Sequence, residues 1–273
     1  MRPRIPRLVP TLVLAIVAVL GAGHLAAVSA QTPLVPYFGK NNIHYDRFDW
    51  HIYTTDHFEI YYYPEIEQHL ERVAGYAESA YQQISADLKH DLSFKVQLIL
   101  FKTHSEFEQQ NVAPPDASSE GVGAFAEPVR NRMLLPIDDP PDRLYGLIVH
   151  ELTHQFAFEM IPLSSGVPAW VHEALSDHET GTWTPSDLVR LRDAAAAGVI
   201  PTVAGGAPLD RLWGHAVFDF VAAEYGTQGM RRYLTALGNS PPTSDSVLAP
   251  FGITASDFDR AFQTYVRTRF NDR

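Results

Sequence analysis

The chain has 273 residues, a formal net charge of −11 and no cysteine. The acidic balance argues against nucleic acid or an anionic membrane surface as a partner. The lack of cysteine excludes disulfides and a lipid-modified cysteine anchor. A chain of this length can form one large domain, or two closely packed subdomains, around a sizeable apolar core.

The first thirty residues have the pattern of a secretory signal peptide. Three arginines within the first seven residues precede an apolar run from Leu8 to Leu20, and Val28-Ser29-Ala30 provides a small-residue cleavage site before Gln31. We therefore expect residues 1–30 to be removed and the protein to be periplasmic or extracellular. The alternative is an uncleaved membrane anchor, because the apolar stretch can be counted as far as Val28.

Regular structure is expected from residue 50 onward. Residues 31–49 contain prolines and asparagines and should form an extended N-terminal segment. Two β-rich runs, 50–54 and 58–63, are separated by three residues, which predicts a hairpin. Apolar residues then recur at steps of three and four, and this spacing predicts a helix from Glu65 to Leu88.

A second group of strands follows this helix. Lys95–Phe101 is apolar enough for a buried strand, and two further strands are expected at 124–127 and 132–137. Between them, Thr103 and Glu106 have the spacing of a capping box that begins a short helix.

The segment His150-Glu151-Leu152-Thr153-His154 is the most informative part of the chain. We expect it to lie on a helix from about Asp142 to Met160. Residues four apart share a helix face, so His150 and His154 can bind one zinc ion. Glu151 projects about 100° round the helix, beside the metal, where it can take a proton from a zinc-activated water.

A second helix supplies the remaining acidic groups. It begins near Pro168, and it places Glu173 and Asp177 four residues apart on one face. Glu173 is the expected third zinc ligand. Asp177 is expected to support His150 by accepting a hydrogen bond from it, because metal-bound histidines nearly always have such a partner.

Two other ligand sets can be weighed against this one. A metzincin requires glycine and histidine after the first motif, but those positions hold Ala157 and Met160, so this alternative fails. His172 and His178 flank Glu173 and are alternative ligands. We expect His172 to be partly exposed surface, because it points about 100° away from Glu173 on a helix.

The rest of the chain is predicted to be helical. Thr184-Pro185-Ser186-Asp187 begins one helix, which Gly198 ends. Further helices are expected at about 212–225, 229–237 and 256–270, with Gly226 and Gly238 as C-terminal stops. The predicted fold is therefore α+β and zincin-like, as a single domain over residues 50–273. A mixed sheet and the zinc-site helix occupy 50–160, and a helical half occupies 161–273.

The chain resembles the gluzincins, zinc peptidases whose third ligand is a glutamate. The eighteen residues between His154 and Glu173 match the branch of peptidase MA-like domains, and the resemblance covers roughly residues 37–270. The segments 37–42 and 57–64 resemble the opening of secreted bacterial members. Trp170 to Asp177 resembles their later acidic motif, with Ala174 and Asp177 replacing a glycine and a glutamate.

The resemblance implies zinc binding by His150, His154 and Glu173, with Glu151 as the base. It also implies that the edge strand at 124–127 binds the substrate backbone, where Glu127 could recognise a free amino terminus. Relatives often stabilise the oxyanion with a later tyrosine or histidine, and His215 is the candidate here. Many relatives continue into a C-terminal β-propeller that this chain lacks, so a separate partner protein could replace it.

The expected function is that of a secreted zinc metallopeptidase acting on a peptide or protein substrate. The alternative is a zinc-containing binding module that acts with a partner and does not hydrolyse it. Glu151 argues against this alternative, because a structural zinc site closes its fourth position and needs no base.

Overall fold

The computed structural model describes residues 46–110, 123–203, 209–239 and 245–270. The predicted signal peptide and most of the predicted extended segment lie outside the described residues. None of the helices in the described part is both long enough and apolar enough to span a bilayer.

Five strands of the described chain form one mixed sheet in the order β1-β2-β3-β5-β4. The strands are β1 (His51–Thr54), β2 (Phe58–Tyr62), β3 (Val96–Phe101), β4 (Phe125–Glu127) and β5 (Arg132–Pro136). The pairs β1–β2 and β4–β5 are antiparallel, whereas β3 runs parallel to both of its neighbours. The predicted hairpin is confirmed, and β4 lies at one edge of the sheet.

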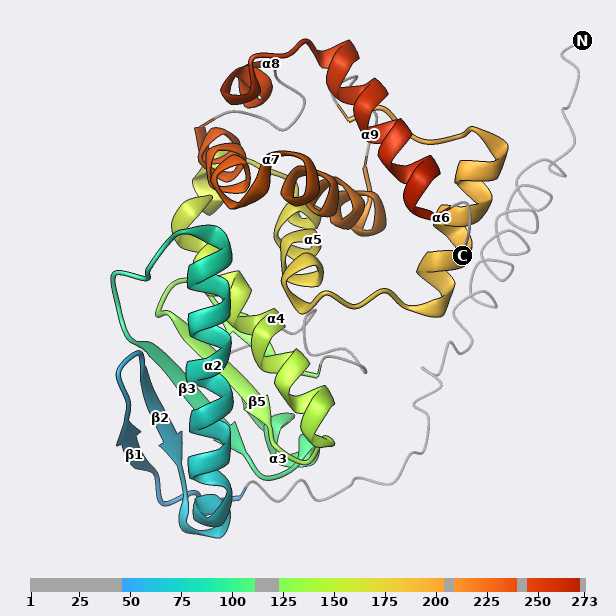
Figure 1. The fold of residues 1–273 in the computed structure, drawn as a ribbon. Helices are drawn as coiled ribbons and strands as arrows, with labels where there is room; N and C mark the ends of the chain where they lie inside the picture. The colour runs from blue at the N-terminus through green and yellow to red at the C-terminus, as the bar shows by residue number, and fades with distance from the viewer. Residues whose placement is uncertain (1–45, 111–122, 204–208, 240–244, 271–273) are drawn as a thin grey trace, which may run out of the picture. The chain divides into compact units, whose positions relative to one another are not determined.

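Helices α2 (Leu70–Leu88) and α4 (Pro141–Met160) lie side by side across the sheet (Figure 1). The apolar stripe of α2 is buried as predicted, but its first turns, Pro64–His69, form a 3-10 helix instead of an α-helix. The short helix α3 (His104–Phe107) begins with the predicted capping box, in which both reciprocal bonds between Thr103 and Glu106 are present.

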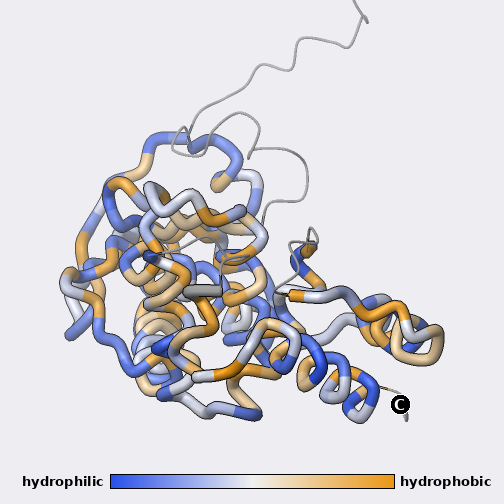
Figure 2. Tube along the Cα trace, turned by 90° about the horizontal axis from the view of Figure 1, so that it is seen from above, coloured by the Kyte–Doolittle hydropathy of each residue, from blue (hydrophilic) through white to orange (hydrophobic). Residues whose placement is uncertain are grey.

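Only helices follow α4 in the described chain. They are α5 (Ala169–Thr180), α6 (Pro185–Ala197), α7 (Arg211–Asn239), α8 (Asp245–Leu248) and α9 (Ala255–Phe270), with short 3-10 turns at Leu163–Ser165 and Ala249–Phe251. Hydrophobic and hydrophilic residues alternate along the helical turns drawn in Figure 2, as expected of helices with one buried face. Helix α5 packs against both α4 and α7, and one apolar core joins these helices to the sheet.

Gly226 and Gly238, which were predicted to end helices, both lie within α7. Gly226 does interrupt the helical backbone, with φ 63° and ψ −172°, but α7 resumes at once, so the two predicted helices form one kinked element. Gly238 lies one residue before Asn239, the last residue of α7, so the predicted stop agrees with the structure to within one residue. A Cβ at Gly238 would lie 2.7 Å from the carbonyl oxygen of Met160, so this glycine also permits the close approach of the end of α4.

Replacing Gly214 with alanine should destabilise the contact between α5 and α7. The new Cβ would lie 2.6 Å from Cε3 of Trp170 and 2.7 Å from Cβ of Ala174. Overpacking of this kind typically costs about 1–3 kcal/mol, which a urea unfolding curve would resolve. Gly75→Ala is the matched control, because nothing lies within 4 Å of its Cβ position in α2. The control should stabilise the protein by about 0.5–1 kcal/mol, and equal effects of the two substitutions would contradict this account.

Candidate metal centre and cleft

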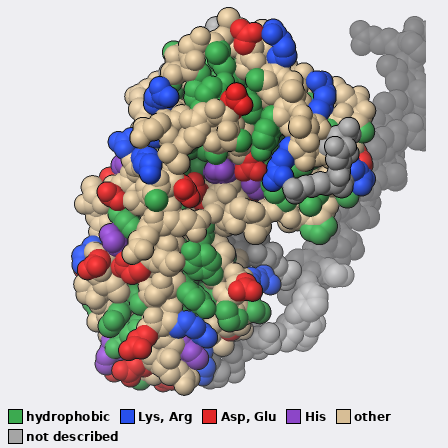
Figure 3. Space-filling view, viewed as in Figure 1, with side chains coloured by type: hydrophobic (Ala, Val, Ile, Leu, Met, Phe, Trp, Pro, Cys, Tyr) green, Lys and Arg blue, Asp and Glu red, His purple; other side chains and the backbone are tan. Residues whose placement is uncertain are grey.

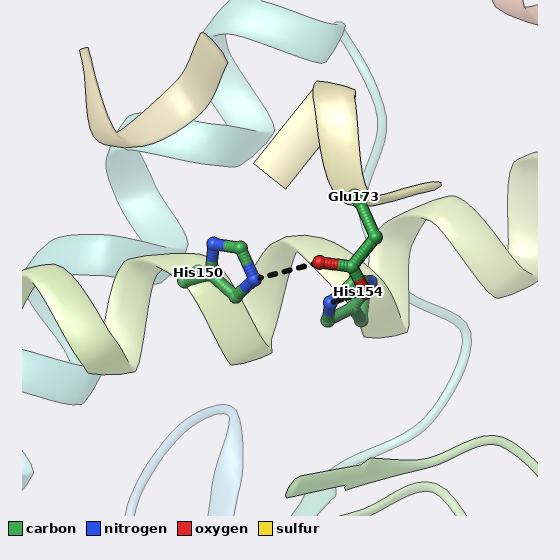
Figure 4. Close-up of side chains that lie close together, drawn as sticks. All are labelled: His150, His154 and Glu173. Carbon is green, nitrogen blue, oxygen red and sulfur yellow. Dashed lines mark ion pairs between the residues drawn. The ribbon is translucent and has the colours of Figure 1, made fainter. Parts of the chain in front are cut away.

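Helices α4 and α5 bring the three predicted ligands together (Figure 4). His150 and His154 lie one turn apart on α4, and Glu173 points at them from α5. The Nε2 atom of His150 lies 3.5 Å from Oε2 of Glu173, and Nε2 of His154 lies 3.5 Å from Oε1. One atom from each residue falls within 4.8 Å of the other two, so a single ion can reach all three.

The donor atoms fit zinc in both spacing and chemistry. Ligands about 2.0–2.2 Å from a tetrahedral zinc ion lie roughly 3.3 Å apart, close to the two contacts above. Burial lowers the pKa of His154 to about 3, which keeps its imidazole neutral, as metal binding requires. Burial opposes ionisation of Glu173, but His150, His154 and Arg211 outweigh it and lower its pKa to about 2.

The predicted supporting carboxylate lies beside His150. Oδ1 of Asp177 is 3.7 Å from Nδ1 of His150, on the side of the ring away from Glu173. This is slightly too long for a hydrogen bond, and the reason is visible in the structure. Arg211, the first residue of α7, donates to both oxygens of Asp177 and also donates to Oε2 of Glu173 at 2.9 Å.

Sequence reasoning missed Arg211. It lies 38 residues from Glu173 and 34 from Asp177, so no local spacing connects it to the motif. Its guanidinium joins Glu173 and Asp177 and offsets part of their negative charge. The same arginine also lines the cleft beside the candidate ligands.

Asp177→Asn should lower the zinc affinity about 10–100-fold, because loss of the carboxylate behind a ligand histidine typically has that effect. Competition with a chelating dye would measure the change. Asp193→Asn is a suitable control, since Asp193 is an exposed residue that pairs only with its neighbour Arg192 in the described contacts. An unchanged affinity in the Asp177 variant would remove this residue from the metal centre.

The ligands open onto a cleft of about 870 Å³. Gly123, Ala124, Phe125 and Ala126 form one wall, so the cleft runs along the edge strand β4. Glu151 lines the same cleft with only 7% of its surface exposed. Burial raises the pKa of Glu151 to about 7, although His150 and a backbone bond from Ala126 oppose the rise.

No protein-family model and no curated protein matches this chain. The interpretation of the cleft therefore rests on its residues and their geometry.

Three other predicted residues differ from expectation or gain no support. The prediction that His172 is partly exposed surface is wrong: it is 5% exposed, its ring packs near Phe158, and neither ring nitrogen has a hydrogen-bond partner. It faces the cleft because α5 turns that side toward α4. Glu127 is paired with Arg132 at 2.8 Å and does not line the cleft.

The structure does not bring His215 to the cleft. Its side chain is buried beneath Trp183, whose ring is stacked on the imidazole with a centroid separation of 3.6 Å. His215 lines a separate, smaller cavity and is absent from the residues lining the cleft. Its predicted oxyanion role therefore gains no support from the geometry.

Proposed function

We propose that this protein is an exported zinc metallopeptidase of the gluzincin type, with a zincin-like fold. One observation carries the proposal. His150, His154 and Glu173 converge with ligand atoms within 4.8 Å, and buried Glu151 lies beside them in a cleft along a sheet edge. When bound, zinc supplies a Lewis acid and lowers the pKa of a water toward 7.

Glu151 has the properties that a general base needs. A base works best when its pKa lies near the operating pH, and burial raises the pKa of Glu151 to about 7. It can accept a proton from the attacking water and return it to the leaving nitrogen. The backbone N–H of Ala126 contacts its carboxylate, so β4 also orients the base.

The edge strand β4 supports an extended peptide as substrate. It pairs with β5 on one side, and it ends the strand order of the sheet. A peptide can add to such an edge through main-chain hydrogen bonds, and it would then pass over the ligands and Glu151. Acidic and basic side chains are interspersed on the face shown in Figure 3, which offers a phosphate backbone no obvious track there.

The experiment that tests this function measures cleavage of a mixed peptide library by mass spectrometry. The purified protein should cleave peptides, lose activity when zinc is chelated, and regain it when zinc is added back. N-terminal sequencing of the exported protein should also show the loss of residues 1–30. Zinc binding without any cleavage would instead favour a binding module that acts with a partner protein.

A further inference from the structure

A second group of metal-ligating side chains lies between α5 and α7. His178 is on α5, and His215 and Asp219 are one turn apart on α7. One ligand atom from each residue lies within 4.8 Å of the other two. Nδ1 of His178 is 2.6 Å from Oδ1 of Asp219, and Nε2 of His215 is 3.6 Å from the same oxygen. Two imidazoles and a carboxylate thus meet at one point.

The buried imidazole of His215 has a nitrogen without a hydrogen-bond partner among the described residues, which indicates that the cluster of His178, His215 and Asp219 can take up a ligand. The side chain of His215 is only 4% exposed, and the unpaired nitrogen is Nε2. A buried polar atom left unpaired typically costs about 1–3 kcal/mol. The 3.6 Å separation from Asp219 is too long for a hydrogen bond. A cation placed between His215, His178 and Asp219 would satisfy this nitrogen.

The surroundings hold the carboxylate in the orientation that a ligand needs. Nε1 of Trp183 donates to Oδ2 of Asp219 at 3.3 Å, which leaves Oδ1 facing the two histidines. The Trp183 ring also stacks on His215 at an interplanar angle of 3° and fixes that imidazole. Metal ligands are commonly oriented by neighbours in this way.

The smaller cavity has a volume of about 330 Å³ and is lined by His215 but by neither His178 nor Asp219, so a cation would approach from the His215 side. Its lining contains more carboxylates than guanidinium groups: Asp177, Asp187 and Asp210 against Arg190 and Arg211. This excess of negative charge favours entry of a cation over an anion.

We propose that His178, His215 and Asp219 bind a divalent cation of the zinc class that fastens α5 to α7. Nitrogen and carboxylate donors suit this class, and His178 and Asp219 need to separate by less than about 1 Å to reach the spacing of zinc ligands. Helix α5 carries Glu173 and Asp177, and α7 begins with Arg211. The second ion would therefore hold the two helices that position the acidic part of the cleft.

The test counts the zinc ions that remain on the full chain after dialysis. The wild-type protein should retain two per chain, and the double variant H150A/H154A should retain one. Asp219→Asn should also retain one, and the triple combination should retain none. His57→Asn is the matched control, because His57 contacts Glu78 at the same 2.6 Å but no third ligand completes that pair among the described residues. It should retain two ions.

Two results would overturn the second site. The first is a folded H150A/H154A variant that retains no zinc, and the second is an Asp219→Asn variant that retains as much as the wild type. If Asp219→Asn does not fold, Co²⁺ titration of H150A/H154A decides the question. A visible d–d absorption that Zn²⁺ abolishes supports the site, and a featureless spectrum refutes it. Retention of one ion by both the wild type and H150A/H154A would refute the metal centre of the cleft but keep this one.

Discussion

Glu151→Gln should lower kcat by about a hundredfold to ten-thousandfold, the usual contribution of a general base. Glutamine has nearly the same shape, so zinc should stay bound, but its amide cannot accept the proton of the attacking water. The pH profile of wild-type activity should also show that Glu151 acts as the base. Because the base must be ionised, activity should fall as the pH drops through the pKa of Glu151. That pKa is about 7 without a bound cation and lower with one.

Glu159→Gln provides the control for this variant. Glu159 lies on the same helix, where it contacts His90 at 3.3 Å and the backbone of Ser93, and it does not line the cleft. The same chemical change there should leave turnover within about twofold, because Glu159 is half-buried away from the cleft and, among the described residues, contacts none of the candidate site. Near-normal peptide cleavage by Glu151→Gln would exclude Glu151 as the base. Loss of zinc from that variant would instead show that Glu151 is a ligand.

The elements that the sequence predicted correctly are those with strong local signals. The hairpin β1–β2 needed only alternating β-rich runs and a short turn, and the capping box at Thr103 needed two residues three apart. The helix start at Thr184 was likewise a local signal, to which the structure adds a second capping box. The convergence of His150, His154 and Glu173 was predictable for the same reason. The two histidines are one helical turn apart, and Glu173 follows on the next helix, so two helical segments place all three candidate ligands.

The features that escaped prediction depend on contacts between distant segments. Arg211 meets Glu173 and Asp177 only because α7 packs on α5, and the burial of His172 follows from the contact of α5 with α4. Gly238 shows the same limit. Its place near the end of a helical pattern predicts a helix stop, but nothing in the local pattern shows that the carbonyl oxygen of Met160 comes so close to it. Helix propensity is local, whereas packing between helices is not.

His154→Ala should abolish zinc binding at the cleft and the stability that zinc provides. A ligand present at 100–1,000 times its Kd stabilises the folded state by about 2.7–4.1 kcal/mol. The wild type should therefore show a clear rise in Tm with added zinc, and a His154→Ala variant that also carries Asp219→Asn should show none. Without zinc, His154→Ala should lower the free energy of unfolding by less than a typical core substitution does. The removed imidazole is buried and its Nδ1 has no hydrogen-bond partner, so its loss also relieves a cost.

His172→Ala, in the same Asp219→Asn background, is a closely matched control for His154→Ala. His172 is also a buried histidine with unpaired nitrogens, it also packs near Phe158, and it also faces the cleft, but its ligand atoms do not join the cluster of His150 and Glu173. Its rise in Tm with zinc should equal that of the background protein. If His172→Ala lost the zinc response while His154→Ala kept it, the ligand set would have to be reassigned to His172. If both variants lost it, the response would reflect packing around Phe158 instead of ligation.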